Sequence, residues 1–166
     1  MSAILKWEER PQELAALINP AFGALLLNAA SLGHVKASDS GLPFIASFLV
    51  LPIILHRDTR TSLPRTLRAK MHSWVADHGE IKADFAGRAR AMAPYTREAL
   101  AFGTERRILT LNRDGALYGR TVSNTKTNWS KDDEPSDCMR KSEFLGRWLG
   151  DTGDLSGIFA MWGIRP

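Results

Sequence analysis

The chain has 166 residues, of which 44% are hydrophobic and 24% charged, and these ordinary globular proportions exclude wholesale disorder. This length predicts one domain, residues 1–166, that buries about 70% of the surface exposed by the unfolded chain. The formal net charge is +4, and its distribution along the chain is more informative than its total.

Cysteine content and the first residues predict a cytoplasmic protein. Cys138 is the single cysteine, so no internal disulfide can form, which is typical of a reducing compartment. Residues 1–10 contain acidic side chains and no apolar run long enough for a signal peptide. The uncharged run Leu42–Leu55 is shorter than the roughly 20 residues that a transmembrane helix needs, so no membrane contact is expected.

The first half of the chain predicts two buried helices. A helical turn or two is expected over residues 11–17, and Asn19 and Pro20 then predict a helix start. That helix is expected over residues 21–32, ended by Gly33 and followed by a polar loop over residues 34–40.

The uncharged run is the predicted centre of the core. Pro43 and Pro52 favour a helix over about residues 44–51 with a kinked, extended exit through Leu55. A buried strand is the alternative, because periodicity cannot separate the two when every position is apolar.

Three short helices are predicted next. The sequence of residues 61–64, Thr-Ser-Leu-Pro, is typical of a helix entry, and Ala93-Pro94 is expected to separate the second helix from the third. Each helix has an apolar stripe at helical spacing: Leu67, Met71, Trp74, Val75 and His78; Ile81, Phe85, Ala89 and Met92; Tyr95, Ala99 and Phe102.

A β-hairpin follows, since residues 108–111 and 116–118 are alternating apolar runs around Asp114-Gly115. Helices followed by a hairpin are the order of a winged helix-turn-helix, with residues 95–107 as the recognition-like helix. Winged folds also serve as protein-interaction modules, so the order alone does not fix a function. The predicted fold class is mostly α (α+β): a compact helical domain with a hairpin wing.

The last third predicts a polar loop over residues 121–136 and two helices. Ser136-Asp137 is expected to cap a helix that reaches Leu149, and Asp154 is expected to begin the last one after a turn at residues 150–153. Residues 162–166 are unusually apolar for a terminal segment, which either docks into the core or plugs into another subunit. The candidate partner-binding residues are Trp129, Phe159, Trp162, Ile164, Arg165 and Pro166.

Two basic stretches, residues 56–70 and 105–131, are candidates for contact with nucleic acid. The alternatives are solvated helix faces or ion pairs with an acidic partner. The candidate nucleic-acid-binding residues are Arg57, Arg60, Arg65, Arg68, Arg106 and Arg107.

No catalytic, metal or cofactor site is predicted. Neither a phosphate-binding glycine loop nor a metal-ligand spacing of His, Cys and carboxylates occurs in the sequence. His56, next to Arg57 and Asp58, is either a general base or the point where the buried run reaches solvent. Cys138 has no histidine near it in sequence to activate it.

Several segments together resemble the middle-component family of bacterial three-component ABC systems, the group that includes the small accessory subunit of Lamassu-type anti-phage defence. Their order and the family-like ending carry the resemblance over most of the chain. The segments are Asn19–Phe22 with Leu25–Leu27, Gly41–Pro43, Leu49–His56, Thr96–Gly103, Lys141–Trp148 and Ile158–Pro166.

The resemblance implies a non-catalytic subunit between an SMC-like or Rad50-like ABC ATPase and an effector, often a nuclease. It also implies that DNA contact, if this chain makes any, occurs within the complex. The competing hypothesis is a stand-alone winged-helix DNA-binding regulator. It is disfavoured because Arg97 is offset by Glu98 and the remaining charge, Arg106 and Arg107, comes at the end of the recognition-like helix.

Overall fold

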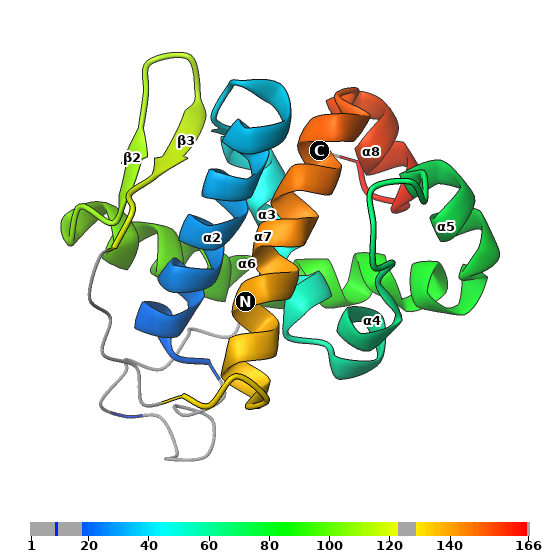
Figure 1. Ribbon diagram of the computed structural model, residues 1–166, viewed down its shortest axis with the longest axis horizontal. Helices are drawn as coiled ribbons and strands as arrows, with labels where there is room; N and C mark the ends of the chain where they lie inside the picture. Colours follow the sequence, from blue (N-terminus) through cyan, green and yellow to red (C-terminus); the bar gives the residue numbers. More distant parts are fainter. Residues whose placement is uncertain (1–8, 10–17, 123–128, 166) are drawn as a thin grey trace.

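The structure is a computed structural model that describes residues 9, 18–122 and 129–165. It is mostly helical with one small antiparallel sheet, so the predicted α+β class is confirmed (Figure 1). The winged-helix arrangement stays a prediction, and the helical turn expected over residues 11–17 lies outside the described residues. The elements are α2 (Pro20–Ser38), β1 (Leu42–Pro43), the 3-10 turn η2 (Phe44–Ala46), α3 (Ser47–Ile54), α4 (Arg57–Ser62), α5 (Met71–Asp77), α6 (Gly79–Glu105), β2 (Leu109–Leu111), β3 (Ala116–Gly119), α7 (Glu134–Thr152) and α8 (Leu155–Met161).

Helices α2 and α7 lie side by side and run in the same direction (Figure 1). Ser142 of α7 donates a 2.8 Å hydrogen bond to the carbonyl of Leu26, and Gly146 faces Ala30 one turn further along both helices. A Cβ on Gly146 would overlap the backbone of Ala30, and one on Gly33 would overlap the backbone of Glu143. The two backbones can approach this closely only because neither glycine has a side chain.

Gly33 therefore does not end α2, which corrects the sequence prediction. The helix continues to Ser38, and Asp39 ends it in a left-handed conformation with φ 57°. Asn19 caps the first turn as predicted, its Oδ1 accepting from the N–H of Ala21 at 2.9 Å. The loop expected over residues 34–40 is helical except at its last two positions.

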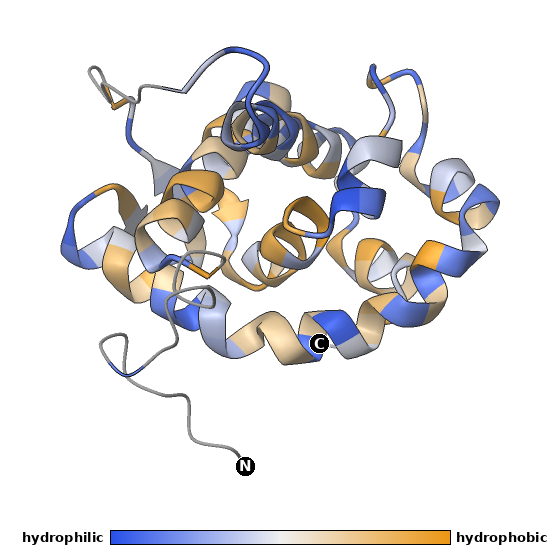
Figure 2. Cartoon of the chain, turned by 90° about the horizontal axis from the view of Figure 1, so that it is seen from below, coloured by the Kyte–Doolittle hydropathy of each residue, from blue (hydrophilic) through white to orange (hydrophobic). Residues whose placement is uncertain are grey.

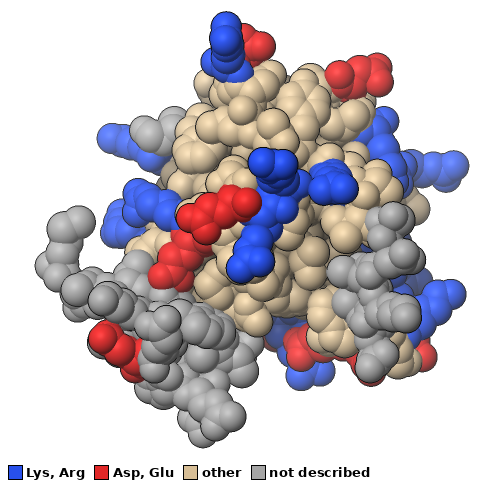
Figure 3. Space-filling view, turned by 90° about the vertical axis from the view of Figure 1, so that its left-hand side faces the viewer, with Lys and Arg blue, Asp and Glu red and all other residues tan. Residues whose placement is uncertain are grey.

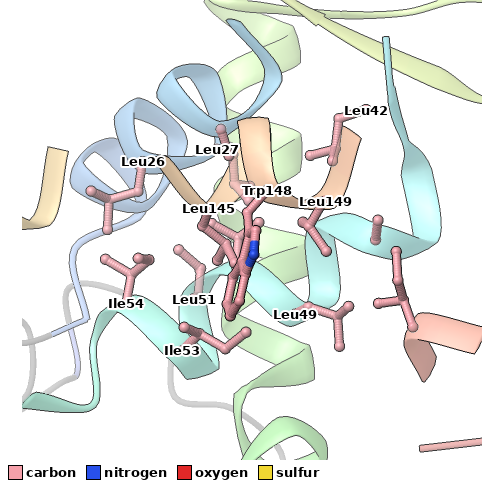
Figure 4. Packing of buried hydrophobic residues seen from close by; sticks show 14 of the residues in the cluster. Leu26, Leu27, Leu42, Leu49, Leu51, Ile53, Ile54, Leu145, Trp148 and Leu149 are labelled. Carbon is pink, nitrogen blue, oxygen red and sulfur yellow. The ribbon is translucent and has the colours of Figure 1, made fainter. Parts of the chain in front are cut away.

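Helix α3 is enclosed by α2, α6 and α7, and the apolar sides of the surrounding helices turn toward the middle of the molecule (Figure 2). Trp148 of α7 lies between leucines of α2 and residues of α3 (Figure 4). The buried run is thus the core helix that was predicted, rather than the alternative strand, although its first two residues form β1. The fully buried aliphatic residues of α3 are Leu49, Val50, Leu51, Ile53 and Ile54.

Proline does not end α3 or α6, contrary to prediction. An interior proline costs about 3 kcal/mol, whereas each buried aliphatic side chain stabilises the fold by about 1.5–3 kcal/mol. Helix α3 buries five such side chains before and after Pro52, so it continues to Ile54 instead of ending in an extended exit. Pro94 likewise lies inside α6, which has buried residues before and after it. The second and third of the predicted short helices are therefore one continuous helix.

The Thr-Ser-Leu-Pro segment is the end of α4 rather than a helix entry. Helix α4 ends at Ser62, and the chain turns until α5 begins at Met71. The physical reason is an earlier cap: the Nδ1 atom of His56 accepts from the N–H of Thr59 at 3.3 Å, and α4 therefore begins at Arg57, ahead of the predicted entry.

The predicted hairpin is present and gains a third strand. Oδ1 of Asn112 accepts from the N–H groups of Asp114 and Ala116, and Gly115 takes φ 77°, which favours glycine. The strand order is β1-β3-β2, with Leu117 of β3 opposite both Leu42 and Leu111. The short segment that enters the core helix is thereby attached to the hairpin.

Arg60 attaches α4 to α7. Its side chain is 4% exposed; Nε lies 3.1 Å from Asp137, Nη2 pairs with Glu134, and Nη1 donates to the carbonyl of Ile54 at 2.8 Å. Asp137 therefore does not cap α7 as predicted; that helix begins at Glu134 after Asp133, and it ends at Thr152 rather than Leu149. Asp154 precedes α8 as predicted.

Glycine-to-alanine substitutions at a close helix contact and at an open position should change the free energy of unfolding in opposite directions. Gly146→Ala should lower the free energy of unfolding by at least about 2 kcal/mol, because the added methyl group overlaps the Ala30 backbone. Gly87→Ala, in the exposed interior of α6 with open space around it, should raise it by about 0.5–1 kcal/mol. Urea denaturation measures both, and a Gly146→Ala protein as stable as the wild type would refute the close approach.

Removal of the Arg60 guanidinium should also be costly. Arg60→Met leaves the Ile54 carbonyl without its donor and the partly buried Asp137 with only the exposed Arg140 as a partner. We expect the free energy of unfolding to fall by about 2–4 kcal/mol. The ion pair with Glu134 contributes little to this loss of stability, because the Glu134 side chain is mostly exposed. Arg57→Met, three residues earlier on the exposed side of α4, is the matched control and should stay within about 0.5 kcal/mol of wild type. Equal effects of the two substitutions in urea denaturation would contradict the structural role of Arg60.

Candidate docking groove beside the C-terminal segment

The C-terminal segment folds back onto the protein. Trp162 is fully buried, with ring-centroid distances of 4.6 Å to Phe85 and 6.0 Å to Trp74. Phe159 is 4% exposed. The apolar ending was expected either to dock into the core or to plug into another subunit. Trp162 is docked into the core of its own chain, and its side chain is not on the surface.

A groove of about 450 Å³ lies between this segment and α6. Its floor is made of α6 alanines, and its walls are Phe48 of α3, Phe159 of α8 and Ile164. Arg90 and Arg165, both exposed, stand at its edge. Three of the predicted partner-binding residues, Phe159, Ile164 and Arg165, are thus brought together at one hollow, while Pro166 lies outside the described residues.

A tight turn positions the wall that the segment forms. Gly163 takes φ 71°, and the N–H of Ile164 donates to the carbonyl of Phe159 at 2.9 Å. Since Phe159 and Trp162 are held in the core, the turn fixes Ile164 and Arg165 at the side of α6. The groove is therefore formed before anything binds to it.

The side of α6 that faces the groove has alanines and cations and no acid. Glu98 faces the start of α2, and Asp84 lies near Arg88 and His56 on another side of the helix. The residues of the groove side recur at spacings of three and four, which places them on one face: Lys82, Ala86, Ala89, Arg90, Ala93 and Arg97.

Apolar surface continues beyond the groove. The Phe48 ring meets Phe44 edge to face at 5.7 Å, and the Arg97 guanidinium stands 5.8 Å above its centre. Phe44 and Ile45 of η2 are 36% and 41% exposed, which is unusual for such large apolar side chains. Together with the groove they form a surface with an apolar centre and arginines around it.

Trp129, the other predicted partner-binding residue, is elsewhere. It is 36% exposed and packs edge to face against Phe22 near the start of α2, with ring centroids 5.6 Å apart. It does not line the groove.

The predicted nucleic-acid-binding arginines are not brought together. Arg60 is buried in its ion pairs, whereas Arg57, Arg65 and Arg68 are exposed in and after α4. Arg106 and Arg107 are exposed at the far end of α6. Helix α4 contacts α6 at Arg88, whose Nη2 donates to Thr59, and from there to Arg106 the helix extends about 27 Å.

On the face that contains the hairpin and this end of α6, basic and acidic side chains are interspersed (Figure 3). The arginines of the two basic stretches, residues 56–70 and 105–131, therefore form two separate groups in the structure.

The residues considered for chemistry have structural surroundings. Nδ1 of His56 lies 2.8 Å from the hydroxyl of Thr59, and burial and the nearby Arg88 lower the pKa of His56. A neutral ring at this position is what caps α4, because Nδ1 must accept. Burial raises the pKa of Cys138, which is 3% exposed and lies near Arg60, Glu134 and Asp137.

Within the described ranges no group of three His, Cys or carboxylate side chains could hold a metal ion, and no helix is long and apolar enough to cross a membrane. Sequence reasoning missed Phe48 and the alanines of the groove floor. The available signal was the spacing of Ala86, Ala89 and Ala93 between Lys82 and Arg97, where small residues replace the large apolar ones expected of a core stripe.

Comparison with known proteins identifies the family. The family model described as ABC-three component (ABC-3C) system Middle Component 3 matches residues 7–166. Comparison with curated proteins and with solved structures gave no match. The match covers nearly the whole chain and agrees with the resemblance carried by the sequence segments. The chain belongs to the Middle Component 3 family of ABC-three component systems.

Proposed function

We propose that this protein is a non-catalytic accessory subunit of a Lamassu-type bacterial defence complex that acts against phage or plasmids. In this complex it bridges an SMC-like or Rad50-like ABC ATPase and an effector, for which a nuclease is the first candidate. The observation that carries the proposal is the match to a middle-component family over residues 7–166. The name of that family describes a protein that works with other components.

The surface chemistry supports a role in binding other proteins. Interfaces between proteins are enriched in aromatic residues and arginine around a desolvated centre. The groove has this composition, with Phe48 and Ile164 at its walls and Arg90 and Arg165 at its edge. In the proposed complex the chain holds the effector inactive and releases it when the ATPase encounters foreign DNA, so the chemistry belongs to the other two subunits.

The alternative is a stand-alone winged-helix regulator that reads DNA. Its recognition-like helix, residues 95–107, is the second half of α6, and its buried side packs against other elements through Thr96, Ala99, Leu100 and Gly103. DNA-reading helices place their base contacts near their N-terminal end. Here residue 95 has no free N-terminal turn, since the helix begins at Gly79, and this weighs against the regulator.

Co-expression with the products of the neighbouring genes tests the bridging role. We expect this chain, carrying an affinity tag, to co-purify with a large coiled-coil ATPase and with an effector, and native mass spectrometry of the eluate to show all three in one species. Recovery of the chain as a lone monomer or dimer that shifts duplex DNA would instead support the regulator.

The arginines after His56 provide a separate prediction for the assembled complex. Replacing Arg57, Arg65 and Arg68 with alanine should reduce the slope of log affinity against log salt concentration by about 0.9 for each DNA phosphate that is no longer neutralised. Titration of labelled duplex DNA at several salt concentrations measures this slope. Arg147→Ala, exposed on α7 and outside both basic stretches, is a control that should leave the slope unchanged. An unaltered slope in the triple variant would show that these three arginines do not contact DNA phosphates in the complex.

A further inference from the structure

We propose that the groove between α6 and the C-terminal segment takes an acidic amphipathic helix of another subunit. In this arrangement, apolar side chains of that helix fill the groove, and its carboxylates meet the cations around it. The inference rests on the proposed function, because it names the chemistry of a partner that the bridging role requires.

Charge is the first argument. Lys82, Arg90, Arg97 and Arg165 surround the groove, and none of the four forms an ion pair with another described residue. Lys82 reaches across to the segment, since its Cε lies 3.9 Å from where a Cβ on Gly163 would be. Four cations with no acid between them repel one another, and a partner with carboxylates at this position relieves that repulsion.

The apolar floor and walls identify the partner as protein rather than nucleic acid. Interfaces with DNA are polar and wet, and burying the methyl groups of Ala86 and Ala93 against phosphates would gain nothing. Apolar side chains in the same place gain from desolvation of Phe48 and Ile164, with a contribution that grows with the apolar area buried. The exposed Phe44 and Ile45 extend this apolar surface beyond the groove.

The shape of the groove favours a helix as the occupant. Its floor is a helix, and a helix offers no strand edge with which an extended peptide could pair. A partner backbone entering an apolar groove must satisfy its own hydrogen bonds, as a helix does. From Lys82 to Arg97 the face extends about 22 Å, the length of a helix of about 15 residues.

Small residues in the floor permit close approach. Ala86, Ala89 and Ala93 project only a methyl group each, so the axis of a docked helix can come near that of α6. The partner's larger side chains then fill the space between Phe48 and Phe159. This is the helix-in-groove mode of recognition, in which apolar residues at helical spacing supply the anchors.

Charge reversal tests the proposal in the co-expressed complex. Arg90→Glu with Arg97→Glu should raise the dissociation constant at least about tenfold, with the difference shrinking as salt is added. Arg113→Glu with Arg147→Glu changes the net charge by the same amount in the hairpin and on α7. Neither residue lines the groove, so the affinity should be unchanged. Equal affinities for wild type and the groove variant, with circular dichroism confirming that both fold, would overturn the proposal.

Zero-length cross-linking identifies the occupant directly. A carbodiimide joins an amine to a carboxylate in contact with it, so in the wild-type complex Lys82 should be coupled to an aspartate or glutamate of a partner helix, identified by peptide mass spectrometry. In an Arg90→Lys variant the same helix should be coupled at position 90 as well. Links from Lys82 only to this chain or to a second copy of it, or ultraviolet cross-links from the groove to DNA, would overturn the inference.

The outcomes separate the two proposals. If wild-type protein recovers no partners, the bridging function fails. If the complex assembles and its affinity does not respond to the Arg90 and Arg97 substitutions, only the assignment of the groove fails. Ala93→Trp gives an independent check by filling the groove without altering charge, and it should weaken assembly at least about tenfold at high as well as low salt.

Discussion

The close parallel contact between α2 and α7 is the constraint on which the other elements depend. Gly33 and Gly146 let each backbone touch the other helix, and Ser142 adds a buried hydrogen bond to the carbonyl of Leu26. Helices that are adjacent and parallel cannot be joined by a short connection, so the chain between them must travel from one end of the pair back to the other. Helices α3 to α6 and the hairpin are that return path, and α3 is buried as part of it.

The same arrangement determines where a free helix face remains. Helix α6 crosses α2 and α3 with the side that contains Phe85, Ala99 and Leu100, which commits that side to the core. Trp162 then packs on Phe85 and brings the C-terminal segment alongside the helix. The segment covers part of the remaining surface of α6 and leaves the alanine face open between itself and Phe48. The shape of the groove thus follows from core packing.

Local signals in the sequence predicted the elements whose causes are local. Asn19 caps α2, the turn around Gly115 makes the hairpin, and Asp154 precedes α8, each through bonds or dihedral preferences within a few residues. The wrong boundaries at Gly33, Pro52 and Pro94 have the opposite origin. These residues are ordinary helix terminators, but burial against other parts of the chain outweighs their local cost. The stabilisation from such burial cannot be estimated from local sequence, because it depends on which distant parts of the chain pack against the helix.

The arginines show the same limit at the candidate site. Arg57 and Arg60 are three residues apart in one basic stretch, yet Arg57 faces solvent while Arg60 holds α4 to α7 through Asp137. Charge density along the sequence could not separate them, because a carboxylate 77 residues away decides which arginine is neutralised. Arg90 and Arg97 were not among the predicted binding residues, and in sequence Arg97 is followed by Glu98, which in the structure faces the start of α2 instead of the groove. In the proposed interaction the cations of the groove face account for an acidic partner, because no acid lies on that side of α6, and the apolar walls account for a protein rather than DNA.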